Sequence, residues 1–239
     1  MSSKQSSHNQ YQREYFDTVE RARLAIGDTP YVLAHVDRVV AAAGLRAGQR
    51  ILEVGAGPGK FTLPLASRGL DVVANDLSPV LLERLHQTSG GRVKTLACDV
   101  ADIARAVDAP FDRVVGFFVL HHLRGFEHAF TALAAVMQPG ARLVFCEPVA
   151  WNPLYYLQIL LTPGMRYAGE PSLTSMRVGV IVPALRAAGF VDTEATGYGY
   201  FPPVLKNHPL GNRLENWLDR RAWIPFPHAF QLFTARLPG

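Results

Sequence analysis

A loop of three glycines between two apolar runs is the feature that most restricts how this chain folds. The first apolar run, at 51–54, leads into Gly55-Ala56-Gly57-Pro58-Gly59, and the second ends at Asp76. Glycines let the backbone turn sharply and let a ligand approach main-chain N–H groups, and a helix that follows adds its positive end. The sequence therefore predicts a strand, a ligand-binding loop, a helix and a second strand in that order.

Short β-branched runs alternate with helical patterns as far as residue 147, which is typical of a parallel sheet with helices on both faces. The strands are expected at 50–54, 71–75, 92–97, 113–117 and 142–147, and the helices at 60–68, 79–87, 102–107 and 126–137. A helix at 178–188 and strands at 190–196 and 228–236 complete the pattern. We therefore predict an α/β fold: a doubly wound, mostly parallel, seven-stranded sheet with a final antiparallel strand and a lid.

Three segments fall outside this core, at 10–48, 148–176 and 197–227, and the last two are rich in Pro, Gly and aromatic residues. The middle segment leaves from the carboxyl end of a strand, where ligands bind in open α/β sheets. We expect one domain. Its parts are a helical cap at 1–48, a ligand-binding core at 49–147, lid insertions at 148–176 and 197–227, and completion of the core at 177–196 and 228–239.

Composition excludes few classes of function. The net charge of +4 comes from scattered basic residues, which favours solvated surface charge over a nucleic-acid partner. Cys98 and Cys146 have no metal-like spacing, which suits a reducing, cytoplasmic compartment. The polar N-terminus resembles no signal peptide, and the most apolar stretch, 154–161, is shorter than the roughly 20 residues of a spanning helix. We expect no transmembrane segment, whereas peripheral membrane contact and the oligomeric state stay open.

Residues 54 and 60 separate three kinds of glycine loop. A Walker loop would need Gly at Val54 and Ser or Thr at Phe61, and a dinucleotide loop would need Gly at Lys60. What remains, acid-x-Gly-x-Gly-x-Gly from Glu53 to Gly59, resembles motif I of the class I S-adenosylmethionine (SAM)-dependent methyltransferases. The sequence VLHHL at 119–123 is similar to the type 11 small-molecule group. The resemblance covers roughly residues 45–147 and implies a Rossmann-like fold with SAM as cofactor.

The resemblance also assigns cofactor contacts. The glycine turn passes close to the amino-acid part and ribose of SAM, and Asp76 can accept hydrogen bonds from both ribose hydroxyls. Asp99 would face the adenine amino group, and Glu53 would either touch SAM or organise the glycine loop. The expected cofactor-binding residues are Glu53, Gly55, Ala56, Gly57, Gly59, Asp76, Leu77, Asp99, Val100, Phe117 and Tyr15.

Methyl transfer from a sulfonium is an in-line displacement, so the protein mainly positions the nucleophile and excludes water. A base is needed only for a hydroxyl, an activated carbon or a protonated amine. His121 and His122 lie beside the expected methyl site, and Glu147 and Glu170 are further catalytic candidates. The alternatives are a structural histidine pair, a loop-organising Glu147 and a surface Glu170. No metal site is expected, because the histidine pair has no acidic partner at ligand spacing.

The acceptor is indicated only by the lid. The segment after the fourth strand reads GFFV instead of the [DN]-P-P-[FYW] element of adenine and glutamine methyltransferases, which disfavours nucleic-acid substrates. Aromatic residues in the lid favour a small hydrophobic acceptor, such as an isoprenoid, aromatic, polyketide or lipid-like metabolite, methylated on O, C or N. These are Trp151, Tyr155, Tyr156, Tyr167, Tyr198, Tyr200, Phe201, Trp217, Trp223 and Phe226. The alternatives are a SAM-binding scaffold without turnover, an RNA methyltransferase and a nicotinamide oxidoreductase.

Overall fold

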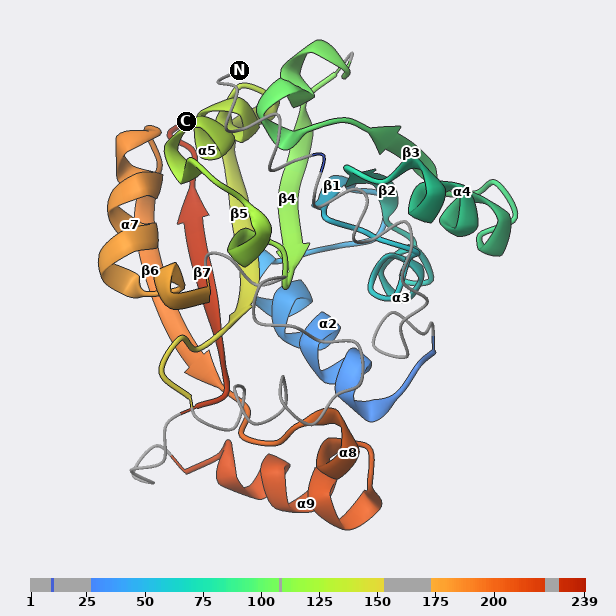
Figure 1. Ribbon diagram of the computed structural model, residues 1–239, viewed down its shortest axis with the longest axis vertical. Helices are drawn as coiled ribbons and strands as arrows, with labels where there is room; N and C mark the ends of the chain where they lie inside the picture. The colour runs from blue at the N-terminus through green and yellow to red at the C-terminus, as the bar shows by residue number, and fades with distance from the viewer. Residues whose placement is uncertain (1–9, 11–26, 108, 153–172, 222–227) are drawn as a thin grey trace.

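The computed structural model describes residues 10, 27–107, 109–152, 173–221 and 228–239. Within them one sheet has the strand order β3-β2-β1-β4-β5-β7-β6 (Figure 1). The strands are β1 Arg50–Val54, β2 Asp71–Asp76, β3 Lys94–Ala97, β4 Phe111–Phe117, β5 Met137–Pro148, β6 Val191–Tyr198 and β7 Phe230–Arg236. Neighbours among β1 to β5 pair in parallel, and β7 runs antiparallel between β5 and β6. The predicted fold class is confirmed.

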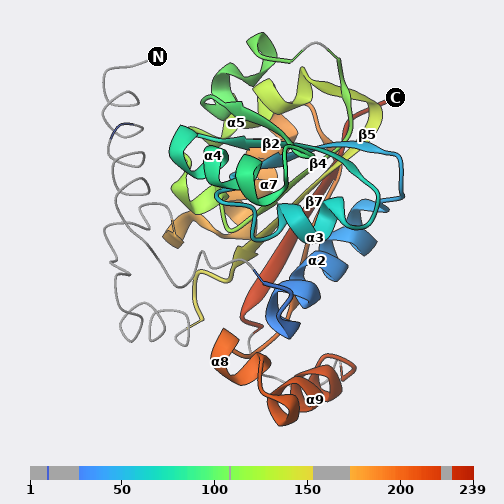
Figure 2. The ribbon, with the colours of Figure 1, turned by 90° about the vertical axis from the view of Figure 1, so that its right-hand side faces the viewer.

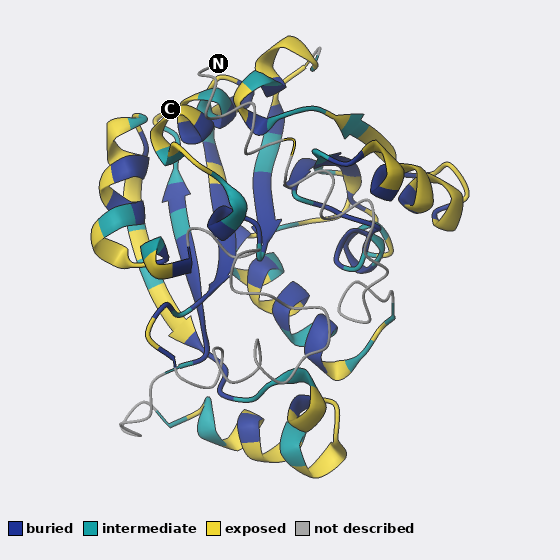
Figure 3. Ribbon diagram, viewed as in Figure 1, coloured by how far each residue is buried: buried dark blue, intermediate teal, exposed yellow. Residues whose placement is uncertain are grey.

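Helices cover both faces of this sheet. The described helical elements are α2 Pro30–Ala43, α3 Thr62–Ala66, α4 Pro79–Thr88, η2 Val100–Arg105, η3 Leu120–His122, α5 Phe126–Ala134, η5 Leu173–Ser175, α7 Val178–Ala187, α8 Pro203–Lys206 and α9 Pro209–Leu218. Successive strand residues point to opposite faces, so Val115 packs with α2 and α3 whereas Val114 packs with α5 and α7. The central strands are therefore buried on both sides (Figure 3).

Local signals fix the ends of the helix that borders the site. Thr29 caps the first turn of α2 by accepting a hydrogen bond from the Val32 amide, and Pro30 supplies a φ suited to the first helical position. Gly44 ends the helix in the left-handed conformation, with φ of 62°. Tyr31, His35 and other apolar-face residues then point into the protein.

Several predicted boundaries are wrong. The helix expected at 126–137 ends at Ala134, and β5 begins at Met137, before the Pro-Gly turn, because Met137 pairs with Phe111. The register then shifts between Phe111 and Arg113, which accommodates the turn inside the strand. The helix expected at 60–68 spans only Thr62–Ala66. The helix expected at 102–107 is a 3₁₀ helix at Val100–Arg105 that starts earlier because Asp99 caps it.

The helices α8 and α9 form a hairpin beyond the carboxyl end of β6 (Figures 1 and 2). Two polar contacts join this hairpin to α2. The side-chain oxygen Oδ1 of Asn207 accepts a hydrogen bond from the Tyr31 amide at 2.9 Å, and Arg38 pairs with Asp219 at 2.8 Å. The described part of the segment expected as a lid, 197–221, therefore lies against α2 at the edge where the parallel strands end. Its role as a lid stays a prediction.

Candidate active site

The glycine loop after β1 combines close packing with one open position. A Cβ on Gly55 would lie 2.3 Å from Cγ2 of Val119, and a Cβ on Gly59 would lie 2.5 Å from Cδ1 of Leu85. No described atom lies within 4 Å of a Cβ placed on Gly57, and all three glycines have positive φ. Gly55 and Gly59 thus let the loop pack against its neighbours, whereas Gly57 has space on its Cβ side that a ligand can fill.

Asp76 ties the end of β2 to this loop. Its Oδ2 accepts a hydrogen bond from the Gly57 amide at 2.8 Å, and its Oδ1 accepts one from the Ser78 amide at 2.9 Å. The sequence analysis missed Asn75, which is buried and donates from its side chain to the carbonyls of Leu96 and Cys98. The only sequence signal for Asn75 is its position next to Asp76 at the end of the predicted second strand. Asp76 and Asn75 therefore hold three loops together at the carboxyl edge of the sheet.

The expected adenine contacts lie one strand further along. Asp99 accepts a hydrogen bond from the Ala101 amide at 3.0 Å and so caps η2. Val100 is buried, while Leu77 is partly exposed. Ala56 is buried, and its amide donates to the carbonyl of Asn75. These residues line one edge with Asp76, as the strand order requires.

Glu53 is a buried carboxyl beneath the glycine loop. It is 1% exposed, and its Oε2 has no hydrogen-bond partner among the described residues. Burial raises the pKa of Glu53, the Thr62 hydroxyl lowers it and the Asp76 charge raises it, so that the pKa lies at about 8. A cation placed beside Oε2 would favour the ionised form.

Glu147 organises the segment after β4. Its Oε1 accepts hydrogen bonds from the amides of Val119 and Leu120 at 2.8 and 2.7 Å, and its Oε2 lies 2.6 Å from Nδ1 of His121. Both side chains are almost fully buried, and the His121 ring centroid is 4.1 Å from that of His122. Because Val119 also packs against Gly55, this arrangement joins the histidine pair to the glycine loop.

An aromatic cluster separates the glycine loop from α2. Phe117 is buried and stacks on Phe61 with ring centroids 4.4 Å apart. The next residue, Phe118, has φ of 54°, a left-handed conformation that is uncommon for a non-glycine residue. Its ring lies 5.0 Å from His35 and 5.7 Å from Phe230. The cluster therefore connects the end of β4 with the buried face of α2.

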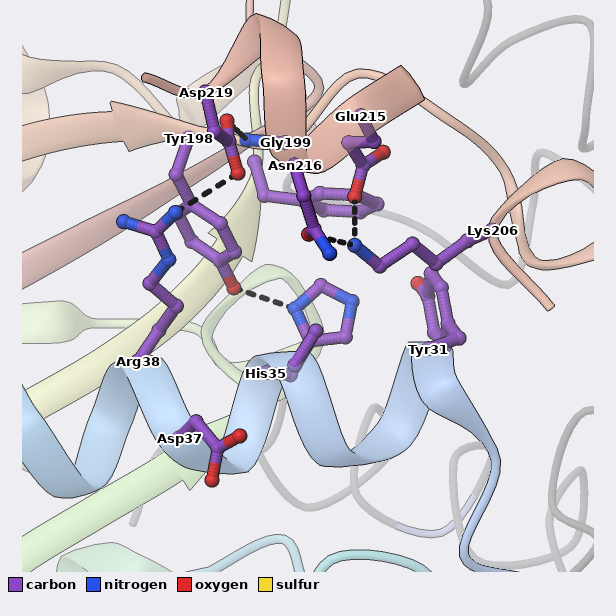
Figure 4. A pocket seen from close by; sticks show the side chains of 12 residues that line it. Tyr31, His35, Asp37, Arg38, Tyr198, Gly199, Lys206, Glu215, Asn216 and Asp219 are labelled. Atoms are coloured by element: carbon purple, nitrogen blue, oxygen red, sulfur yellow. Dashed lines mark hydrogen bonds and ion pairs between the residues drawn. The ribbon is translucent and has the colours of Figure 1, made fainter. Parts of the chain in front are cut away.

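His35, which contacts this aromatic cluster, also lines a pocket of about 180 Å³. The pocket lies between α2, the end of β6 and the α8–α9 hairpin (Figure 4). His35 Nδ1 is 2.5 Å from the Tyr198 hydroxyl, which is 2.8 Å from Sγ of Cys146. Burial lowers the pKa of His35, and the charges of Lys60, Lys206 and Arg38 lower it further, so the imidazole is neutral. The pocket is lined by Tyr31, Ala34, His35, Asp37, Arg38, Tyr198, Gly199, Lys206, Glu215, Asn216, Asp219 and Phe230.

The far wall of this pocket is an ion pair that the sequence analysis missed. Lys206 Nζ lies 2.7 Å from Oε1 of Glu215, and both side chains are almost fully buried. Glu215 Oε2 accepts hydrogen bonds from the amides of Tyr200 and Phe201, so it also fixes the chain that leaves β6. Nothing in the sequence around Lys206 and Glu215 distinguishes them from charged residues on the surface. They are buried because α8 packs on α9.

Several expected site residues cannot be placed. Tyr15 and Glu170 lie outside the described residues, as do the lid aromatics Tyr155, Tyr156, Tyr167, Trp223 and Phe226. Of the described lid aromatics, Tyr198 lines the pocket and Tyr200 is buried, whereas Trp151 and Trp217 are exposed. Among the described residues no group of three or more His, Cys, Asp or Glu side chains is arranged to hold a metal ion.

Comparison with known proteins identifies the family. A family described as "Methyltransferase domain" matches residues 52–145. A ubiquinone biosynthesis O-methyltransferase from Dechloromonas aromatica (strain RCB) is 30% identical over 185 residues, covering 73% of this chain and 78% of the relative. The chain belongs to the class I SAM-dependent methyltransferases. A demethylmenaquinone methyltransferase from Clavibacter sepedonicus is 28% identical to this methyltransferase over 184 residues, covering 76% of this chain and 68% of the relative.

Solved structures agree with the fold of the methyltransferase. N-methyltransferase NodS from Bradyrhizobium japonicum WM9, in complex with S-adenosylhomocysteine, has a TM-score of 0.62 at 17% identity and covers 97% of this chain and 99% of that chain. Haemonchus contortus phosphoethanolamine N-methyltransferase 2, in complex with SAM, has a TM-score of 0.60 at 20% identity, covering 96% of this chain and 56% of that chain. The predicted family and its cofactor, SAM, are confirmed. None of the described helices is long and apolar enough to cross a membrane.

Proposed function

We propose that this methyltransferase transfers the methyl group of SAM to a small aromatic acceptor that carries hydroxyl groups, such as a quinol. The observation that carries the proposal is the pocket between α2 and the α8–α9 hairpin, whose lining combines aromatic and charged side chains. Aromatic walls suit a ring, and the polar side chains suit its hydroxyl substituents. The two relatives named for ubiquinone and menaquinone support the same class of acceptor.

The pocket neighbours the glycine loop. The Lys60 ammonium lies 5.8 Å from the centre of the Tyr31 ring, and His35 contacts both Phe61 and Phe118. Tyr31 and His35 line the pocket, whereas Lys60 and Phe61 follow the third glycine of the loop. A single layer of aromatic side chains thus stands between the pocket and the residues that start α3.

The glycine loop fits SAM in two respects. The open Cβ side of Gly57 leaves room for a ligand against the backbone, and the orphaned Oε2 of Glu53 suits the ammonium of the methionine part. SAM supplies a methyl group activated by its sulfonium. The residues that would hold it are the glycine loop, Asp76 at the ribose and Asp99 at the adenine, with Tyr15 as a further candidate contact.

The proposal assigns the base to His121 and its orientation to Glu147. A carboxylate only accepts hydrogen bonds, so Glu147 favours the tautomer of His121 that carries its proton on Nδ1, in which Nε2 is the basic nitrogen of the ring. His121 would take the proton of the acceptor hydroxyl as that oxygen gains the methyl group, which SAM would supply from its sulfonium, leaving a neutral thioether. His122 stays an alternative candidate for the base, and Glu170, which lies outside the described residues, stays a prediction.

Methyl-labelled SAM tests the proposal directly. The protein is incubated with labelled SAM and separate panels of catechols and hydroquinones, aliphatic alcohols, amines, and RNA. We expect label on hydroxylated aromatics, because only these match both the aromatic and the polar side chains that line the pocket. Label confined to amines or RNA, or SAM binding without turnover on any panel, contradicts the proposal.

A pocket-filling pair of variants locates the acceptor. Ala34 lines the pocket from α2, whereas Ala41 is exposed on the same helix. Ala34→Phe is expected to raise the acceptor KM at least about tenfold while the SAM Kd changes less than about threefold, because the new ring occupies acceptor volume only. Ala41→Phe serves as the matched control and should leave both constants unchanged. An unchanged acceptor KM in Ala34→Phe would place the acceptor elsewhere.

The pKa of Glu53 makes stability and SAM binding depend on pH. Burial raises this pKa from 4.5 to about 8. Between these two pH values Glu53 is therefore protonated in the folded protein and ionised in the unfolded chain. The contribution of Glu53 to the free energy of unfolding is therefore full below pH 4.5 and is lost as the pH rises through about 8, at up to about 1.4 kcal/mol per pH unit. Glu53→Gln should reduce the fall in Tm between pH 6 and 9, as followed by thermal unfolding.

The same group links SAM binding to proton release. An ammonium beside Glu53 favours the carboxylate, so SAM binding at pH 7 should release about one proton. Titration calorimetry in two buffers of different ionisation enthalpy measures this number, and Glu53→Gln should bring it close to zero. Equal proton release in the wild type and in Glu53→Gln would show that Glu53 does not contact the ammonium of SAM.

A further inference from the structure

The α8–α9 hairpin exposes five large apolar side chains to solvent. Val204, Leu205, Leu210, Leu214 and Trp217, here called the hairpin patch, are between 48% and 83% exposed. Leu210, Leu214 and Trp217 follow one another at helical spacing of four and three residues, so they lie on one face of α9. This is the largest grouping of exposed apolar side chains on neighbouring described elements.

Acidic side chains and arginines of the hairpin lie on different sides of it. Its acidic residues, Glu215 and Asp219, are turned inward, where Glu215 pairs with Lys206 and Asp219 pairs with Arg38. Asp219 also accepts a hydrogen bond from the Gly199 amide. No carboxylate of the segment 203–221 is therefore left to balance cations on the outer side of the hairpin.

The outer side carries arginines. Arg213 and Arg220 are exposed and form no ion pair with any described residue. The Arg221 guanidinium lies 3.7 Å from the centre of the Trp217 ring. The hairpin therefore presents leucines and a tryptophan interleaved with unneutralised guanidinium groups, which is the composition of a helix that lies in the headgroup region of a bilayer.

We propose that the hairpin patch docks the methyltransferase onto the surface of an anionic lipid bilayer. Apolar side chains enter the boundary between headgroups and acyl chains while the arginines pair with lipid phosphates. The hairpin projects from the carboxyl edge of the sheet, so its outer side can meet a flat surface (Figures 1 and 2). A second copy fits less well, because the arginines of two patches would face each other.

Docking would bring the pocket to the membrane. The helices that carry the hairpin patch also contribute Lys206, Glu215, Asn216 and Asp219 to the pocket walls. An apolar acceptor dissolved in the bilayer would then reach the pocket without crossing bulk water. The docking inference rests on the hairpin patch and its charges, and it holds for any acceptor.

Vesicle sedimentation of the full chain tests the inference. The probes are vesicles of phosphatidylcholine alone and of phosphatidylcholine mixed with phosphatidylglycerol. We expect binding to the anionic vesicles that weakens with added salt, because salt screens the attraction between the surface arginines and the lipid phosphates. The double variants Leu210→Ser/Leu214→Ser and Arg213→Glu/Arg220→Glu should each weaken this binding at least about tenfold.

Controls separate docking from misfolding and from self-association. Val178 on α7 is also about half exposed, and Val178→Ser should bind vesicles as the wild type does. A thermal shift with SAM reports that each variant still folds and binds cofactor, which depends on the glycine loop and not on the hairpin. The inference is overturned by absent binding to anionic vesicles, by unchanged binding of both double variants, or by loss of a dimer instead of vesicle binding in Leu210→Ser/Leu214→Ser.

Discussion

Glu147→Gln is expected to lower kcat by about 10³-fold while the SAM Kd changes less than about threefold. The amide oxygen of glutamine can still accept the hydrogen bonds from Val119 and Leu120, so the segment after β4 keeps its support. The amide NH₂, however, would donate toward Nδ1 of His121, where the carboxylate accepts. The imidazole would then carry its proton on Nε2 and could not take another from the acceptor. Single-turnover rates and SAM titrations measure the two quantities.

A matched change elsewhere in the sheet separates this effect from a general loss of charge. Glu194 is an exposed glutamate on β6, and Glu194→Gln should leave kcat unchanged. A Glu147→Gln protein that keeps its kcat within about threefold would show that His121 is not the base. A protein that instead loses SAM binding would show that Glu147 acts through the loop alone. The pH profile of kcat adds a third readout, because its acidic limb belongs to the base and should disappear with it.

The pairing behind this prediction follows from the register of two strands. The sequence analysis named His121 and Glu147 separately, 26 residues apart. The parallel pairing of β4 and β5 places Phe117 opposite Cys146, so the residues that follow each strand emerge side by side. Register of this kind depends on the whole sheet, and a pattern of apolar residues in one strand does not determine it. The sequence thus indicated both residues but not their contact.

The cofactor loop was more predictable because its constraints are local. β1 spans the expected residues, and the three glycines have the positive φ that their spacing implies. The interaction of Asp76 with Gly57 follows from the parallel alignment of two consecutive strands. A strand, a turn and the next strand along the chain therefore suffice to predict the geometry of this loop, whereas its contacts with SAM stay a prediction.

The pocket could not be predicted, because its residues come together only through tertiary packing. His35 and Tyr198 are 163 residues apart, and a histidine on the buried face of a helix usually indicates ordinary core. Lys206 and Glu215 are buried by the packing of α8 on α9, where a Cβ at Gly211 would lie 2.0 Å from the carbonyl oxygen of Leu205. The sequence predicted an aromatic lid, whereas the described pocket is partly polar, with residues of two ion pairs in its lining.

Asp76→Ala is expected to raise the SAM Kd by about 10² to 10⁴-fold. The side chain makes two charge-assisted hydrogen bonds with backbone amides, to Gly57 and Ser78, and each such bond contributes roughly 1.5–3 kcal/mol. Its loss frees the glycine loop and also removes the carboxylate assigned to the ribose hydroxyls. Titration calorimetry, or the thermal shift at graded SAM concentrations, measures the change.

Two comparisons make the Asp76 result specific. Asp71 stands at the exposed start of the same strand, with only a 4.0 Å contact to Lys94, so Asp71→Ala should keep the SAM Kd within about threefold. Because the Asp76 charge contributes to the raised pKa of Glu53, Asp76→Ala should also move the pH-dependent fall in Tm to lower pH. Wild-type SAM affinity in Asp76→Ala would refute the assigned cofactor site. If SAM affinity weakens but the pH-dependent fall in Tm does not move, Asp76 belongs to the cofactor site but does not influence the pKa of Glu53.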